Sequence, residues 1–207
     1  NTLIDGLAGD ALTDADYNVA VGKGSLTTDT MGSQTTAIGF EALATQNFTT
    51  ATVSRNVAVG YQAGKATSTG TDNTFIGHQA ALVNTTGYYN TAVGKAALSA
   101  NLSGINNTAL GYLAGTAVTT GVQNVIIGAI AGDALTDADA NVVLGYAALS
   151  SDTLGSKSVA IGTGALYAQN FTTATNSYNT AVGDSAGNAV TTGVSNTLIG
   201  GLSGDAL

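Results

Sequence analysis

The chain has 207 residues, a formal net charge of −8 and only 9% charged residues, and it contains no Pro, Cys or Trp. Its five fixed cations are scattered, which excludes a nucleic-acid surface, and no apolar run of about 18 residues is present that could insert into a membrane. The absence of Cys excludes disulfides, thiol catalysis and cysteine metal sites together. Apolar residues nevertheless reach 44%, which predicts a folded chain.

One phrase, Asn-x-apolar-aliphatic-Gly, recurs along the whole chain. Its twelve copies begin at Asn1, Asn18, Thr35, Asn56, Asn73, Asn90, Asn107, Asn124, Asn141, Ser158, Asn179 and Asn196. The spacing is constant except at two places where it is longer, and both of these carry nearly the same insert, 46–55 and 169–178. A fixed short period is the signature of a solenoid. The octapeptide GDALTDAD at 9–16 also returns at 132–139, and we expect the chain to be a fragment of a longer repetitive chain.

Each unit, numbered from its first residue, predicts a short strand at positions 2 to 4, because position 2 is Thr or Val and position 4 is Val, Ile or Leu. In chain order these strands are expected at 2–4, 19–21, 36–38, 57–59, 74–76, 91–93, 108–110, 125–127, 142–144, 159–161, 180–182 and 197–199. The Gly at position 5 predicts a bend, followed by a second short strand and a turn.

A unit this short cannot bury its own apolar side chains, whereas stacked units can. We therefore predict an all-β fold: a single domain, 1–207, built as a parallel β-solenoid or β-roll of about twelve coils. At about 4.8 Å per coil the rod would be roughly 58 Å long.

Stacking places the residues at position 1 above one another, and we expect their side chains to form an amide ladder. The asparagines of this ladder are Asn18, Asn56, Asn73, Asn90, Asn107, Asn124, Asn141, Asn179 and Asn196.

Position 3 is also apolar in every unit, although it must point away from positions 2 and 4. We assign positions 2 and 4 to the coil interior, so position 3 is predicted to face a second copy of the chain. The residues of this predicted oligomer interface are Ala20, Ala37, Ala58, Phe75, Ala92, Ala109, Ile126, Val143, Ala160, Ala181 and Leu198.

The segments NVAVGKGSL at 18–26 and SVAIGTGAL at 158–166 resemble the head repeats of trimeric autotransporter adhesins. The form NTAVGxxAL is also similar to repeats of phage tail-fibre shafts. The first resemblance implies a left-handed parallel β-roll, three chains packed side by side around one axis, and an adhesive role at an outer surface. It extends over every unit, and the period is longer than that of the usual head repeat of the adhesins.

Acidic residues cluster at two turns, where Asp10, Asp14 and Asp16 are repeated as Asp133, Asp137 and Asp139. Three carboxylates on one turn could bind calcium, but their spacing matches neither an EF-hand nor the glycine-rich nonapeptide repeat. We expect solvated acidic turns, with calcium as the alternative and no other cofactor. Because Glu41 is the sole glutamate and the aspartates recur with the repeat, no catalytic carboxylate pair is indicated and we do not expect an enzyme.

The two inserts each contain an Asn-x-Thr sequence, at Asn47 and Asn170. An insert that bulges from a coil corner would expose these side chains, so both are candidate glycosylation sites.

Taken together, the sequence predicts a segment of an extracellular, cell-surface adhesive fibre that acts through its rod shape and multivalent contact. Its expected partners are further copies of itself, in a homotrimer, and a surface ligand that the sequence does not identify. A phage tail-fibre shaft on a virion and a purely structural extracellular filament remain as alternatives.

Overall fold

The computed structural model describes residues 1–205 and is all-β, with no helix in that part of the chain. Its strands are β1 (Thr2–Ile4), β2 (Val19–Val21), β3 (Gly32–Ser33), β4 (Thr36–Ile38), β5 (Thr52–Val53), β6 (Val57–Val59), β7 (Thr74–Ile76), β8 (Thr91–Val93), β9 (Thr108–Leu110), β10 (Val125–Ile127), β11 (Val142–Leu144), β12 (Gly155–Ser156), β13 (Val159–Ile161), β14 (Thr175–Asn176), β15 (Thr180–Val182) and β16 (Thr197–Ile199). The predicted domain is thus covered except for residues 206 and 207, which lie outside the described residues.

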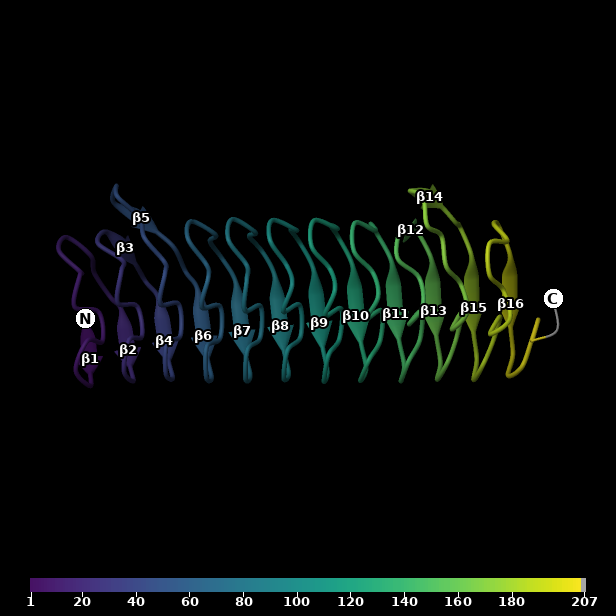
Figure 1. Cartoon of the computed structure of the whole chain (residues 1–207), viewed down its shortest axis with the longest axis horizontal. Coiled ribbons are helices and arrows are strands. Elements are labelled where there is room, and N and C mark those ends of the chain that lie inside the picture. The colour runs from purple at the N-terminus through teal and green to yellow at the C-terminus, as the bar shows by residue number, and fades with distance from the viewer. Residues whose placement is uncertain (206–207) are drawn as a thin grey trace.

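Twelve of these strands form one parallel sheet in which each strand pairs with the equivalent strand of the next coil. Figure 1 shows them side by side along the rod, from β1 at one end to β16 at the other. The register joins equivalent positions, as in the pairs Thr91↔Thr108 and Val93↔Leu110. The predicted parallel β-solenoid of about twelve coils, with one repeat unit in each coil, is therefore confirmed.

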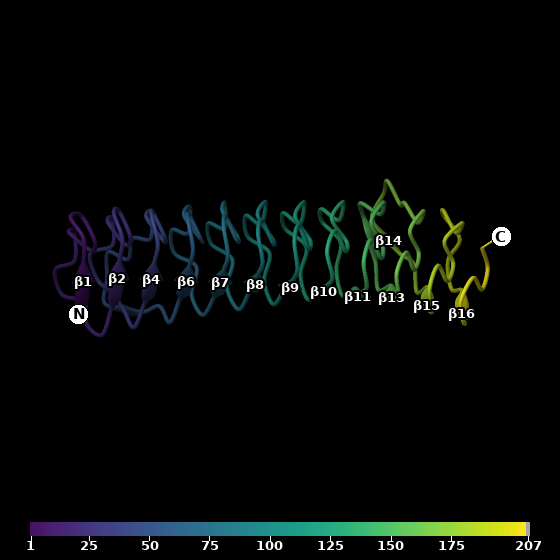
Figure 2. The same cartoon turned by 90° about the horizontal axis from the view of Figure 1, so that it is seen from below.

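The rod has its two ends far apart, with successive coils stacked along one axis in both views (Figures 1 and 2). Within residues 1–205, strand-to-strand contacts are made only between neighbouring coils of the sheet and within the two short additional sheets. No helix of the described residues is long and apolar enough to cross a membrane.

Position 3, the middle residue of each strand, points into the coil, so the predicted oligomer interface is wrong. Ten of its eleven residues are buried inside the single chain, and Leu198 is half-buried and packs against the core. The buried ten are Ala20, Ala37, Ala58, Phe75, Ala92, Ala109, Ile126, Val143, Ala160 and Ala181. The strand alternates as expected, but in the opposite sense: positions 2 and 4 point outward.

The core is filled by side chains of complementary size at positions 3 and 9. Ala92 is followed by Leu98 in its coil, whereas Ile126 is followed by Gly132 and also packs beside Gly115 of the preceding coil. A Cβ built on Gly115 would lie 2.8 Å from Cδ1 of Ile126, so this glycine provides the space for the larger side chain. In these coils a large residue is accommodated where the opposite position is small, which is how interiors reach close packing.

The second short strand that was predicted after the bend is absent from the ordinary coils of the described chain. The backbone there runs through turns, and alternate residues take left-handed backbone angles, such as Ala96 (φ 54°) and Leu98 (φ 49°). This zigzag returns the chain to the next strand within one short circuit, so no extended second strand forms.

The extra strands of the described chain pair each insert with the coil that precedes it: β5 of the first insert pairs with β3, and β14 of the second with β12, each pair parallel. Figure 1 shows both inserts, at β5 and β14, protruding beyond the outline of the other coils. The additional length is thus accommodated at a corner without changing the register of the twelve-stranded sheet, as expected for a longer loop.

Candidate functional surfaces

The position-1 asparagines lie one above another and are almost all fully buried. Each side chain spans two levels of the stack. Asn90 donates from Nδ2 to the carbonyl of Gly104 (2.7 Å) and accepts at Oδ1 from the backbone N–H of Asn107 (2.9 Å). This pattern differs from a pure amide ladder, because side chains bond mainly to backbone groups. It satisfies buried backbone groups that the short strands leave without a ladder partner.

Amide-to-amide bonds occur between only three pairs of neighbouring position-1 asparagines within the described residues. They join Asn124 to Asn107, Asn141 to Asn124, and Asn196 to Asn179, at 3.1 to 3.2 Å.

The asparagine column is interrupted at each insert by a buried polar cluster. In the second cluster, the Asp152 carboxylate accepts bonds from the backbone N–H groups of Gly155 (3.1 Å) and Phe171 (2.9 Å) and from Nε2 of Gln169 (2.6 Å). Gln169 also donates to Oγ of Ser158 (2.9 Å). The carboxyl group is fully buried, and these three donors satisfy its oxygens.

The same cluster recurs at the first insert, with Asp29, Gln46 and Thr35 in the equivalent places. In both, the asparagine that follows the insert donates to the glutamine: Asn56 to Gln46 and Asn179 to Gln169, each at 2.8 Å. Each glutamine therefore substitutes for the missing asparagine of its coil.

The calcium candidates are not brought together by the fold. Within residues 1–205, no group of three or more His, Asp or Glu side chains is close enough to hold a metal ion. Several of the carboxylates instead bond hydroxyls of a neighbouring coil, as Asp10 does with Thr27 and Asp137 with Thr120, both at 2.6 Å. For the full set Asp10, Asp14, Asp16, Asp133, Asp137 and Asp139, the structure supports acidic turns along the stack.

The glycosylation candidates lie at the start of the protruding inserts. Asn170 is exposed and Asn47 half-buried, and each accepts a long hydrogen bond from a threonine of the preceding coil (3.3 and 3.4 Å).

The outer face of the twelve-stranded sheet, here called the sheet face, is formed by positions 2 and 4. None of the side chains at these two positions is charged and none is buried. Position 4 presents an unbroken aliphatic column: Ile4, Val21, Ile38, Val59, Ile76, Val93, Leu110, Ile127, Leu144, Ile161, Val182 and Ile199. A continuous apolar stripe of this kind is typical of an interaction surface.

A second exposed column lies at position 6, just after the glycine bend, and is rich in aromatic residues. Phe40 stacks on Tyr61 (ring centroids 5.4 Å apart) and Tyr61 on His78 (5.1 Å), with nearly parallel rings. The next coil places the Lys95 ammonium 5.7 Å from the ring centre of Tyr112, a cation–π contact. His78 is thus an outward member of a stack.

Two ion pairs join neighbouring coils on the surface. Lys65 Nζ lies 2.6 Å from Glu41 Oε2, and this contact together with a bond from Gln62 lowers the pKa of Glu41 below its ordinary value. Arg55 binds Asp72 through two nitrogens (2.5 and 3.1 Å) and lowers the pKa of that carboxyl.

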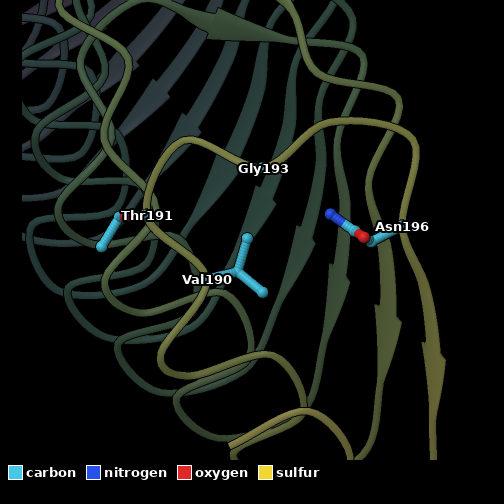
Figure 3. A pocket seen from close by; sticks show the side chains of 4 residues that line it. All are labelled: Val190, Thr191, Gly193 and Asn196. Atoms are coloured by element: carbon cyan, nitrogen blue, oxygen red, sulfur yellow. The ribbon is translucent and has the colours of Figure 1, made fainter. Parts of the chain in front are cut away.

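One hollow of about 310 Å³ lies at the C-terminal end of the described stack, lined by Val190, Thr191, Gly193 and Asn196. Figure 3 shows Val190 and Asn196 pointing into it. In earlier coils the equivalent positions 12 and 1 are covered by the next coil, so this hollow is the open interior of the solenoid.

No family model, curated protein or solved structure matches this chain. What the chain does must therefore be argued from its own surfaces.

Sequence reasoning missed both the outward direction of positions 2 and 4 and the aromatic stack at position 6. For the first, the size compensation between positions 3 and 9 was the available signal. For the second, the signal was the recurrence of aromatic residues at one unit position in Phe40, Tyr61, Tyr112 and Tyr146.

Proposed function

We propose that this chain is a rod-like segment of an extracellular fibre that assembles with two further copies through its sheet face. The observation that carries the proposal is the aliphatic column at position 4, which is uncharged and at least partly exposed over the whole length of the sheet. In water such a surface favours association, because burying it removes apolar area from solvent. A partner copy that presents the same column would cover it along the full rod.

The trimer, the left-handed coil and the adhesive role at a cell surface come from the resemblance to trimeric adhesin head repeats, and they are part of the same proposal. A rigid rod with a short repeat suits such a role, since it places many similar surfaces at fixed spacing and supports multivalent binding. A phage tail-fibre shaft would use the same architecture and the same interface.

The test is the mass of the purified chain by light scattering. Three times the 20.2 kDa chain mass is the expected result. Val93→Glu with Ile127→Glu should convert the assembly to monomers, because it buries two carboxylates in an apolar contact. The matched control, Tyr112→Glu, lies on a neighbouring coil outside the sheet face and should leave the mass unchanged. A monomeric parent chain, with the sheet face uncovered, would overturn the proposal.

A further inference from the structure

A shallow groove of about 260 Å³ crosses the first four coils beside the position-6 column. Lys23 and Phe40 line it from position 6, Gly24 and Glu41 from position 7, and Lys65 from position 10. Position 7 is a glycine in the second coil, Gly24, and it leaves space at this point of the groove. The nearest atom to a Cβ built there is Glu41 Cγ at 3.5 Å, so any larger side chain would extend into the groove.

The groove offers an aromatic surface at the end of a stack. Phe40 is the terminal ring of the Phe40–Tyr61–His78 stack, with Tyr61 covering one side and 39% of the residue still exposed. The next residue along the column is Lys23, and the two cation–π contacts found within residues 1–205 involve other lysines. Phe40 therefore presents ring surface to the groove that no protein group of the described chain covers with an aromatic or cationic contact.

Polar groups of both signs surround this ring. Glu41 holds Lys65 and Gln62 through Oε2 alone (2.6 and 2.9 Å), so Oε1 has no hydrogen-bond partner within the described structure. Lys23 is exposed and forms no direct ion pair with any of residues 1–205, although its charge contributes to lowering the pKa of Glu41. Thr27, also at the groove, donates its hydroxyl to Asp10 (2.6 Å). A free ammonium and a free carboxylate oxygen thus lie beside an apolar ring.

The groove is not required by the repeat itself. Residues 9–55 recur as 132–178, with the same buried cluster and nearly the same insert, as the pairs Asp29 and Asp152 and Gln46 and Gln169 show. The surface positions of the groove differ completely there: the equivalents of Lys23, Phe40, Glu41 and Lys65 are Tyr146, Thr163, Gly164 and Asn188. The requirements of folding therefore account for the buried residues that the two segments share, but not for the combination of Lys23, Phe40, Glu41 and Lys65 at the surface.

We propose that the groove binds a pyranose unit that carries a carboxylate, such as a uronate of an acidic polysaccharide. The C–H face of the sugar packs on Phe40, the ring hydroxyls donate to Glu41 Oε1, and the sugar carboxylate pairs with Lys23. The groove lies after the glycine bend, outside the sheet face, so assembly through that face leaves it open. The inference deepens the proposed adhesive function and rests on it by naming the ligand class.

The test is calorimetric titration of the full chain with tetragalacturonate, and with maltotetraose as the neutral counterpart. We expect binding of the acidic oligosaccharide, with affinity lowered about tenfold in Phe40→Ala and in Lys23→Gln, and no binding of the neutral one. Tyr146→Ala is the matched control, because it removes an exposed position-6 ring outside the groove and should change nothing.

Absence of binding by the parent chain, equal binding of the neutral sugar, or unchanged affinity in Lys23→Gln would each overturn the groove assignment. Circular dichroism of the variants establishes that they are folded. Light scattering on the same samples separates this result from the assembly: a trimer that does not bind refutes only the groove, whereas a monomer that binds refutes only the assembly.

Discussion

Gly64 and Phe75 share one space inside the rod. A Cβ built on Gly64 would lie 2.6 Å from Cδ2 of Phe75, closer than real side-chain contacts allow. The glycine is at position 9 of one coil and the phenylalanine at position 3 of the next, so the two coils are matched in volume across their boundary. Leu43 fills position 9 of the preceding coil and also borders this space, 2.9 Å from the same built Cβ.

Gly64→Ala should destabilise the chain more than Gly164→Ala does. Both glycines have nearly the same left-handed backbone (φ 58° and 63°), but a Cβ on Gly164 has no neighbour closer than 3.7 Å. The difference therefore isolates overpacking, which we expect to be roughly 1–3 kcal/mol in the free energy of unfolding by urea. Adding Phe75→Leu to Gly64→Ala should recover part of the loss. Equal losses in the two single variants would contradict this volume matching.

Position 5, the glycine bend, should tolerate a side chain even less than position 9 does. A Cβ on Gly111 would lie 2.5 Å from the carbonyl oxygen of Gly128 in the next coil, and its φ of 141° is unfavourable for other residues. Gly200 has a similar backbone (φ 118°) but nothing within 4 Å of a built Cβ. We expect Gly111→Ala to lower the free energy of unfolding by roughly 3 kcal/mol or more, and Gly200→Ala by about 1–2 kcal/mol. Thermal melts of both variants measure this, and a similar shift in the two would rule out the backbone contact as the cause.

The buried cluster at each insert should depend on its carboxylate. Asp152→Ala leaves two buried backbone N–H groups without their acceptor and removes one of the two acceptors of Gln169 Nε2, which should cost roughly 2–4 kcal/mol. Asp137→Ala, at an exposed carboxylate that bonds only Thr120, should stay within about 0.5 kcal/mol of the parent chain. Urea unfolding compares the two, and a small effect of Asp152→Ala would mean that water replaces the carboxylate.

Acid should weaken the contact between the third and fourth coils. Lys65 holds the pKa of Glu41 below its ordinary value of 4.5, so protons bind the unfolded chain more readily than the folded one. The stabilisation is complete above about pH 4.5 and is lost as the pH falls through the lower, folded-state pKa. Glu41→Gln should therefore flatten the fall of the urea midpoint between about pH 5 and 3. Because the pair is exposed the change will be small, and Lys65→Gln, which removes the partner, should reproduce it.

The constant spacing of the repeat units was enough to predict most of the fold. Equivalent positions that recur at a constant spacing can only be satisfied together by stacking in register, and the strands of the twelve-stranded sheet lie where the β-branched pairs predicted them. The error lay in which face of each strand was assigned to the coil interior. Alternation says that position 3 opposes positions 2 and 4, but when both sides are apolar it does not say which side is inside. The pairing of Phe75 with Gly64 and of Ala92 with Leu98 contains that answer, because only residues sharing an interior need matched volumes.

The surfaces were less accessible to sequence reasoning. Asn90 and its equivalents were expected to stack, yet their bonds to backbone groups follow from the turn geometry, which the residue pattern does not contain. The groove at Phe40 depends on a glycine one position beyond a lysine, in a unit position that varies from coil to coil. The residues at such surface positions differ from unit to unit, so the repeat pattern does not predict them.

Because strands contact only the strands of neighbouring coils, the cross-section of the rod is the same whatever the number of coils. Evolution can therefore lengthen or shorten it by duplicating or deleting whole units, without redesigning a core. The length of the rod is therefore set by the number of repeat units in the gene. Each added coil also supplies new outward positions, on which a binding surface can arise independently of the neighbouring coils.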